Sequence, residues 1–290
     1  MPVTVSSCPL CGSEHSAHFD RRTFRGQPVV NRLCHSCGLV YQSPRMDDTE
    51  LTIFYEAEYR QLYQGGEGPD AKDLTVQIRR AEALLAFCKD QLPYVKRHLD
   101  IGCSAGLLLQ HFQGAYNCQS LGVEPGAAYR QYAQNQGLTV YDSLDEVKGQ
   151  EMERFDLVSM AHVLEHLPDP VGYLEGLRKD LLEPEGRLLV EVPNLYAHDS
   201  FEVAHLVSYS AHTLRQTLGK AGFEVTVLEA HGRPRSHLLP IYLTALAHPF
   251  EKHTSFQVQP ESNVRLKRRW GMSRRRVLTR LFPRQAWLPI

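Results

Sequence analysis

The stretch LDIGCSAGLLLQHF, residues 99–112, decides the fold of this 290-residue chain. A short apolar run ends at Asp100, two glycines follow at Gly102 and Gly106, and an apolar segment with helical spacing begins at once. That order predicts a β-strand, a tight turn and an α-helix. Glycines in such a turn let backbone N–H groups approach a ligand, and the start of a helix adds a partial positive charge. The stretch predicts either a ligand cradle or an ordinary strand-to-helix turn.

Segments with strand and helix character alternate on both sides of this turn. Strands are expected at 95–101, 119–123, 138–141, 155–160, 186–192 and 223–229, and helices at 105–113, 126–136, 170–182 and 210–221. Strands that alternate with helices of about 10 to 13 residues imply a parallel sheet covered on both faces. Residues 93–250 are therefore predicted to form a doubly wound α/β domain.

Four of the seven cysteines form two CxxC pairs, each followed by a glycine: Cys8 and Cys11, and Cys34 and Cys37. Two such turns present four thiolates, the usual ligand set of a structural tetrahedral zinc ion. A redox pair or disulfides are the less favoured alternatives. Between the pairs, HFDRRTFRGQPVVNRL alternates polar and apolar residues around a turn at Arg25-Gly26, as a small hairpin does. Residues 1–45 are predicted to form a zinc ribbon.

Residues 46–92 are expected to form a tyrosine-rich helical lid and a linker helix. Tyr55, Tyr59 and Tyr63 recur every four residues, which places them on one face of a helix. They form either a packing stripe or a lid in which a phenol, such as that of Tyr59, contacts substrate. A second helix over 71–92 is expected to pack through its apolar positions Leu74, Ile78, Ala81, Leu85 and Cys88.

The second predicted strand ends at Glu124, about 20 residues after the glycine turn, where an acid can accept the hydroxyls of a ribose. At this point the chain resembles the class I S-adenosylmethionine (SAM)-dependent methyltransferases. The resemblance covers residues 93–248 and rests on LDIGCSAG, GVEP, FDLVSMAHVLEHLPDP, GRLLVEVPN and HLVSYSAHTLRQTLGKAGFEV. The segment with the cysteine pairs is similar to the zinc-binding front of bacterial sugar C-methyltransferases.

The resemblance implies a SAM site with a Rossmann-like sheet. The methionine end of the cofactor would lie against the turn and the ribose on Glu124, and the other implied cofactor contacts are Asp100, Gly102, Ser104, Gly106, Asp142 and Ala161, with Asp142 on the adenine amino group. Ser104 replaces the central glycine of the family's usual GxGxG turn. Serine is expected to fit if its φ is negative, and its hydroxyl could bind the methionyl carboxylate. A degenerate, inactive member of the family is the alternative.

Three histidines are candidates for a general base, namely His162, His166 and His205, since imidazole titrates near neutral pH. A bracing role in a turn is favoured for His166. His162 and His166 also spell HxxEH, an inverted zinc-protease signature that needs a long helix. Pro168 and Pro170 leave room for about one helical turn, so the protease interpretation is disfavoured.

Charge is distributed unevenly along the chain. Nine of the 32 basic residues follow Glu261, and no acidic residue does. In the basic tail, residues 251–290, a helix would align four apolar side chains, Leu266, Trp270, Val277 and Leu281, with an interruption at Gly271. That pattern suits an anionic membrane surface or nucleic acid, but a disordered extension is favoured. No leader or spanning segment is recognised, and a cytoplasmic protein is expected.

The sequence thus predicts a SAM-dependent methyltransferase with a structural zinc ion and a small-molecule acceptor. The methyl group would go to a hydroxyl or a carbon of a saccharide or another secondary metabolite. One alternative is an RNA base methyltransferase that uses the ribbon and the tail, against which the acidic body argues. Another is a non-catalytic SAM-binding protein. The sequence makes no prediction of the oligomeric state.

Overall fold

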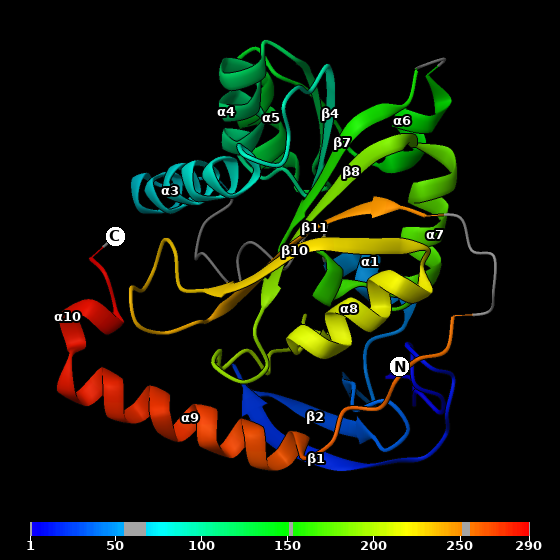
Figure 1. Ribbon diagram of the computed structural model, residues 1–290, viewed down its shortest axis with the longest axis vertical. Coiled ribbons are helices and arrows are strands. Elements are labelled where there is room, and N and C mark those ends of the chain that lie inside the picture. Colours follow the sequence, from blue (N-terminus) through cyan, green and yellow to red (C-terminus); the bar gives the residue numbers. More distant parts are fainter. Residues whose placement is uncertain (1, 55–67, 151–152, 251–255, 290) are drawn as a thin grey trace.

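The computed structural model describes residues 2–54, 68–150, 153–250 and 256–289, and its main element is a twisted seven-stranded sheet (Figure 1). The strand order is β10-β11-β8-β7-β4-β5-β6. β11 runs antiparallel to both of its neighbours, and the pairs from β8 to β6 are parallel. The strands are β4 (Arg97–Ile101), β5 (Gln119–Val123), β6 (Thr139–Tyr141), β7 (Phe155–Ala161), β8 (Leu182–Pro193), β10 (Phe223–His231) and β11 (Tyr242–Pro249).

Helices cover both faces of this sheet, which confirms the doubly wound α/β prediction. Neighbouring residues of one strand point to opposite faces. Leu157 of β7 packs with α3 (Ala71–Cys88) and α4 (Leu107–Tyr116). Its neighbour Val158 packs in the core that includes α7 (Pro170–Asp180) and α8 (Ala211–Lys220). Two shorter helices, α5 (Ala127–Asn135) and α6 (Leu144–Gly149), flank β6 in the sequence.

Two details of the main domain differ from the expectation. β11 was not predicted, because its residues are buried on both faces and read as a continuous apolar run without alternation. Helix α3 ends at Cys88 and buries Val76, Ala81 and Leu84, whereas Ile78 is 38% exposed. The helix is rotated about its axis relative to the predicted orientation, because polar side chains of its inner face line a cavity described below.

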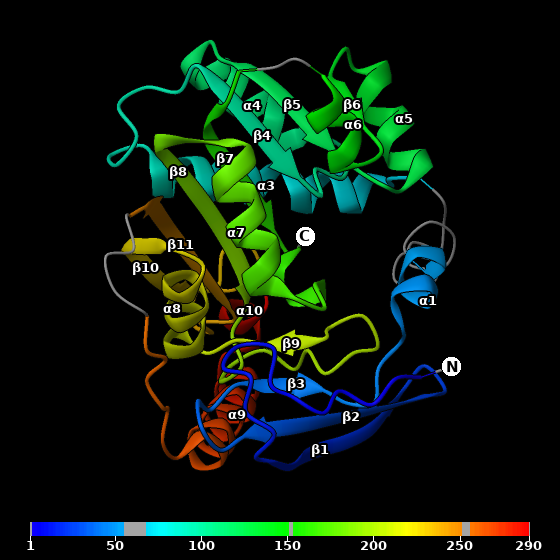
Figure 2. The same ribbon diagram turned by 90° about the vertical axis from the view of Figure 1, so that its right-hand side faces the viewer.

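The N-terminal residues form a second, four-stranded sheet in the order β1-β2-β3-β9. β1 (Ser16–Phe24) and β2 (Gln27–Cys34) make the predicted hairpin, and both turn residues, Arg25 and Gly26, have positive φ. β3 (Val40–Gln42) pairs with β9 (Val207–Ser208), which comes from the main domain. Figure 2 shows this sheet below the main one, with α1 (Asp48–Ile53) beside it. The two sheets share one core, in which Leu39 and Tyr41 pack with residues of β7 and α8.

The C-terminal segment is an ordered helix, so the expectation of a disordered extension is wrong. α9 (Val264–Leu281) lies along the N-terminal sheet and is followed by α10 (Pro283–Ala286) (Figure 2). Gly271 does not interrupt α9: a Cβ there would lie 1.9 Å from the Tyr196 carbonyl oxygen, so glycine is what allows this close approach. Within the described parts of the chain, none of the helices combines the length and apolar character needed to cross a bilayer.

Candidate active site

A cavity of about 810 Å³ opens at the carboxyl ends of the central strands. Gly102 and Ser104 follow β4, Glu124 follows β5, Asp142 follows β6 and Ala161 ends β7, and all five line the cavity. Ligands of open α/β sheets bind at this edge. Small-molecule sites usually have about 300–1,000 Å³, so this cavity has room for a cofactor and a second small molecule.

The glycine turn at one end of the cavity has three residues with positive φ: Gly102 at 72°, Ser104 at 52° and Gly106 at 78°. The condition set for Ser104, a negative φ, is therefore not met. The left-handed conformation costs a non-glycine residue about 1–2 kcal/mol. Its amide compensates, because the Ser104 N–H donates to Glu124 Oε2 at 2.9 Å, while Oε1 of the same carboxylate accepts from Gly126 N–H at 2.9 Å. The acid after β5 thus fixes the turn after β4.

A buried polar chain supports the turn from below. The Ser159 hydroxyl donates to Asp100 Oδ1 at 2.6 Å, and His98 Nε2 lies 2.8 Å from the same hydroxyl oxygen. Burial lowers the pKa of His98 to about 3, so this ring is neutral and can donate one proton to Ser159. Burial and the nearby charge of Glu124 raise the pKa of Asp100 to about 7, despite its bond from Ser159. These three side chains fix the end of β4, and none of them is part of the cavity lining.

His162, which follows β7, also lines the cavity and is held between two carboxylates. Its Nδ1 is 3.2 Å from Glu165 Oε1, and its Nε2 is 3.3 Å from Glu191 Oε1. Burial and the charge of Arg80 lower the pKa of His162, but the two carboxylates outweigh them, so the pKa is raised above its usual value. These two contacts favour the protonated form of the ring and occupy both of its nitrogens, which does not suit the role of base that sequence reasoning gave to His162.

Glu191, a buried acid of β8, links His162 to two further groups. Its Oε1 pairs with Arg80 Nε at 3.0 Å, and its Oε2 accepts a hydrogen bond from the Thr244 hydroxyl at 3.0 Å. Burial acts to raise the pKa of Glu191, but the contacts with His162 and His231 and the charge of Arg80 lower it well below the usual range. Glu191 is ionised and paired, so it supports the cavity wall electrostatically.

His166 and His205 both line the cavity. Their rings contact each other edge to face, with ring centres 4.9 Å apart. His166 Nδ1 lies 2.9 Å from the Ala204 carbonyl oxygen, and His205 Nδ1 lies 2.8 Å from that of Ser200. A carbonyl only accepts, so each Nδ1 carries a proton, and in the neutral form of each ring the lone pair lies on Nε2. Burial lowers the pKa of His166 to about 4, which makes it a weak base.

The same two rings and Glu165 form a possible cation site. One ligand atom from each of the three residues lies within 4.8 Å of the others. A histidine that ligates a metal usually donates its other N–H to a carbonyl or carboxylate, as both rings do here. The protease interpretation of HxxEH is excluded by the backbone: His162 has φ 58°, and only a three-residue 3₁₀ turn, Leu164–His166, follows it.

The four cysteines of the N-terminal segment converge as predicted. Their sulfur atoms lie within 4.8 Å of one another, with Cys8 Sγ 3.6 Å from Cys37 Sγ and Cys11 Sγ 3.5 Å from Cys34 Sγ. All four are free thiols. Sulfur atoms about 2.3 Å from a tetrahedral zinc ion are about 3.8 Å apart, so the cluster fits this ion. Four cysteine ligands would fill all positions of a tetrahedral ion, which is typical of a structural site.

The cysteine-bearing sheet contacts the loop that carries His205. The Gln42 N–H donates to the Leu206 carbonyl at 2.8 Å, and Tyr41 pairs with Val207 in the β3–β9 ladder. A second contact comes from α8, where the Lys220 ammonium donates to the Leu10 carbonyl at 2.6 Å. The backbone beside His205 therefore depends on the fold of the N-terminal segment.

Cys34→Ser is expected to lose the zinc ion and to lower the free energy of unfolding by about 3 kcal/mol or more, because structural metal binding is folding energy. Metal analysis by mass spectrometry and urea denaturation measure the two effects. Cys118→Ser is the matched control. Cys118 is a buried cysteine directly before β5, and it belongs to no cysteine cluster in the described chain. Equal zinc content in both variants would contradict the assignment.

The structure also brings together residues that sequence reasoning missed. The cavity lining includes Arg80 from α3, Tyr242 from β11, and Arg235 and Trp287 from the C-terminal third. Arg80 lies within a helix whose pattern gave no functional signal. Trp287 lies in the tail, which was not assigned to the active site. Tyr59, with Tyr55 and Tyr63, lies outside the described residues, so its contact with substrate stays a prediction.

Residues 74–228 match a protein family described as a methyltransferase domain. Among curated proteins, the ubiquinone biosynthesis O-methyltransferase of Aeromonas salmonicida is 33% identical over 105 residues, which are 34% of this chain and 44% of that protein. The corresponding protein of Glaesserella parasuis is 30% identical over 123 residues, or 38% and 51% of the two chains. The chain spans about half the length of these relatives.

Solved structures show the same fold at lower identity. The 1,6-didemethyltoxoflavin-N1-methyltransferase of Burkholderia thailandensis, crystallised with its acceptor and S-adenosylhomocysteine, superposes with a TM-score of 0.57 at 19% identity. The superposition covers 80% of this chain and all of that one. The magnesium protoporphyrin IX methyltransferase of Synechocystis gives a TM-score of 0.50 at 17% identity, over 71% and 98% of the chains.

Proposed function

Because this chain belongs to the methyltransferase-domain family and has the class I fold, we propose that it transfers the methyl group of SAM to a small molecule. The observation that carries the proposal is the shared cavity. Gly102, Ser104 and Glu124 line the same cavity as a group of histidines. A cofactor against the glycine turn would direct its methyl group toward an acceptor beside the histidines.

The part of the cavity beside the glycine turn would hold SAM. The amides of Gly102, Ser104 and Gly106 are all bonded within the protein, so the methionyl carboxylate would rely on the partial positive charge at the start of α4. Glu124 is buried and accepts two backbone amides, and its remaining lone pairs would accept the ribose hydroxyls, as acids after the second strand do in nucleotide-binding sheets. Asp142, farther along the same edge, would reach the adenine amino group. When bound, the cofactor supplies the electrophilic methyl group.

The part of the cavity beside the histidines suits an acceptor with several hydroxyl groups. Its lining combines hydrogen-bonding side chains with the aromatic rings of Tyr242 and Trp287; the polar members are His162, His198, Glu202, His205 and Arg235. Polar groups that converge in a partly aromatic pocket fix the orientation of a bound ligand. We propose a hydroxyl or an acidic carbon of a saccharide or a similar metabolite as the methylated atom.

We assign the removal of the acceptor proton to His205. Two observations support this assignment: His205 lines the cavity, and its Nδ1 donates to the Ser200 carbonyl, so that the lone pair of the neutral ring would lie on Nε2. His162 holds a proton between two carboxylates and would stabilise negative charge on the acceptor. His166, a weaker base, would support the ring of His205 from the side.

Calorimetric titration with SAM tests the cofactor half of the proposal. The protein is expected to bind one SAM molecule, and Glu124→Ala to weaken the affinity at least about tenfold, or 1.4 kcal/mol, because it removes the ribose acceptor and the anchor of the turn. Glu153→Ala is the control, because Glu153 has an 88% exposed side chain and is not part of the cavity lining. Absence of heat at millimolar SAM would overturn the proposal.

Release of S-adenosylhomocysteine with different acceptors tests the other half. Sugar nucleotides and polyhydroxylated metabolites are expected to support turnover, and transcribed RNA is not. Turnover with RNA alone, lost at raised salt, would replace the small-molecule acceptor by a nucleic acid. SAM binding without turnover on any acceptor would instead favour a binding protein.

A further inference from the structure

The C-terminal helix α9 has two faces of opposite character. Its inner face is docked: Val264 packs in a small core, and Arg268 donates to the carbonyls of Leu195 and His198. Two turns farther, Arg275 donates to the Ala197 carbonyl at 3.0 Å. These contacts fix the rotation of the helix about its own axis, so its outer face is defined.

The outer face presents an apolar stripe to solvent. Leu266 is 66% exposed, Trp270 69%, Val277 54% and Leu281 63%. At 3.6 residues per turn these four side chains fall within an arc of about 60° on the side opposite Arg268 and Arg275. Single exposed apolar residues are common, but a tryptophan and three aliphatic residues aligned over four turns form a continuous patch.

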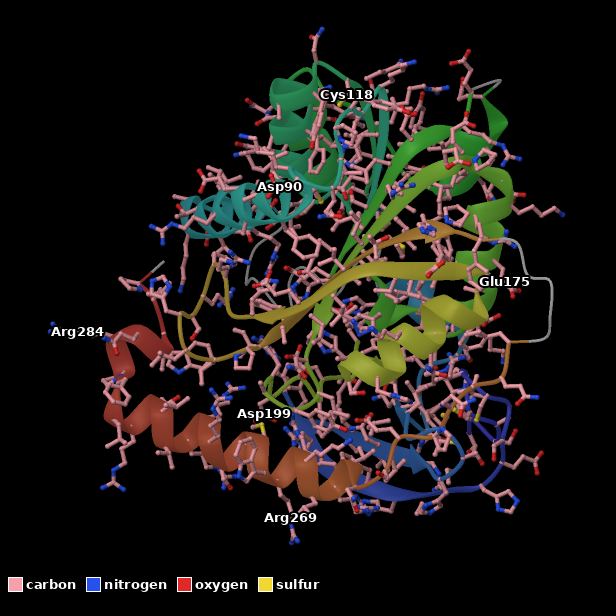
Figure 3. The ribbon with its side chains drawn as sticks, viewed as in Figure 1. Asp90, Cys118, Glu175, Asp199, Arg269 and Arg284 are labelled. Carbon is pink, nitrogen blue, oxygen red and sulfur yellow. The ribbon has the colours of Figure 1, made fainter. Side chains whose placement is uncertain are left out.

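Both edges of this stripe are basic. Arg274 lies on one side, and Arg269, Arg276 and Arg280 lie on the other, all of them exposed. Figure 3 shows Arg269 and Arg284 pointing away from the body of the protein. No acidic residue follows Glu261 in the sequence, so the basic charge of the outer face is not balanced within the helix.

We propose that α9 is an interfacial helix that holds the protein on an anionic lipid surface. The apolar stripe would enter the headgroup region, with the arginines against lipid phosphates. Nucleic acid would neutralise the arginines but leave Leu266, Trp270, Val277 and Leu281 exposed. A second copy of α9 would bury the stripe but bring two arginine-lined edges together, with no acids in the helix to pair them. Of these three occupants, only a lipid surface uses both the apolar stripe and the arginines.

The position of α9 links this surface to the cavity. After α10, Trp287 lines the cavity, and its Nε1 donates to Thr279 Oγ1 of α9 at 3.2 Å. The next residue, Leu288, donates its N–H to the Arg235 carbonyl at 2.9 Å, and Arg235 also lines the cavity. Docking of α9 would therefore place the membrane next to the segment that forms one wall of the acceptor site. The proposal does not depend on methyl transfer.

Co-sedimentation of the full chain with vesicles tests it. We expect binding to vesicles of phosphatidylcholine with 30% phosphatidylglycerol, little binding to pure phosphatidylcholine, and a decrease as salt is raised. The double variant Leu266→Ser/Trp270→Ser and the variant Arg269→Gln/Arg276→Gln/Arg280→Gln should each lower the partition coefficient about tenfold or more. Tyr94→Ser is the control, because Tyr94 is equally exposed, at 62%, but lies far from α9 in the sequence.

Zinc content and SAM binding are measured on each variant, so that a folding defect is recognised. Failure of the parent protein to bind anionic vesicles would overturn the proposal, and so would equal binding by the parent and both variants. A dimer in size-exclusion chromatography that the Leu266→Ser/Trp270→Ser change dissociates would show that the face binds a second copy instead. Salt-sensitive binding to RNA that depends on the three arginines and not on Trp270 would assign the face to nucleic acid.

Discussion

Gly106→Val is expected to abolish cofactor binding while the zinc ion stays bound. Gly106 has φ 78°, which a β-branched residue adopts only with strain. A Cβ at this position would lie 2.3 Å from Leu138 Cδ1 and 3.2 Å from Ala133 Cβ. Because those side chains belong to a buried cluster, the first turn of α4 and the glycine turn would have to move. The affinity for SAM should fall more than about a hundredfold, or 2.7 kcal/mol.

Gly114→Ala is the matched control within the same helix. A Cβ at Gly114 meets no atom within 4 Å, so alanine should leave SAM binding unchanged and raise stability by up to about 1 kcal/mol. Calorimetry gives the affinities, and metal analysis with circular dichroism shows whether each variant is folded. Unchanged affinity in a folded Gly106→Val protein would show that the cofactor does not lie against this turn.

His205→Asn is expected to lower kcat by about 10² to 10⁴ and to leave SAM affinity unchanged. The asparagine amide can still donate to the Ser200 carbonyl, which holds the loop, but it has no basic lone pair to accept the proton. Loss of general base catalysis costs about this much. The measurement is S-adenosylhomocysteine release with the acceptor that supports turnover, alongside calorimetry.

His15→Asn is the control for this change, because His15 is an exposed histidine of the N-terminal segment. Normal kcat in His205→Asn would remove His205 from the reaction. A second result would also overturn its role as base: activity that a chelator abolishes and added Mn²⁺ restores, while the cysteine site keeps its zinc. In that case Glu165, His166 and His205 would act as ligands of a divalent cation.

The same loop connects the two predicted sites. Gln42 and Tyr41 of β3 bind the backbone at Leu206 and Val207, directly after His205. A structural zinc ion that orders β2 and β3 would thereby fix the position of the imidazole. The Cys34→Ser variant should therefore lose turnover more than it loses SAM affinity, because the glycine turn and Glu124 follow β4 and β5 of the other sheet.

Much of this molecule follows from local sequence. The alternation of strands and helices, the hairpin at Arg25-Gly26 and the approach of the four cysteines all depend on neighbouring residues or on one hairpin. The glycine turn and the acid at Glu124 lie about 20 residues apart in one strand–helix–strand unit, so their meeting at one edge of the sheet is also fixed by local order.

Only the tertiary structure decided what surrounds the reacting groups. It places Glu191 of β8 against His162 and Arg80, brings Trp287 to the cavity from the far end of the chain, and docks one face of α9 while leaving the other exposed. Such contacts depend on how helices and strands distant in sequence pack and rotate, which periodicity leaves open. The sequence by itself determined the fold and the candidate ligands, whereas packing determined the protonation of His162 and the outer face of α9.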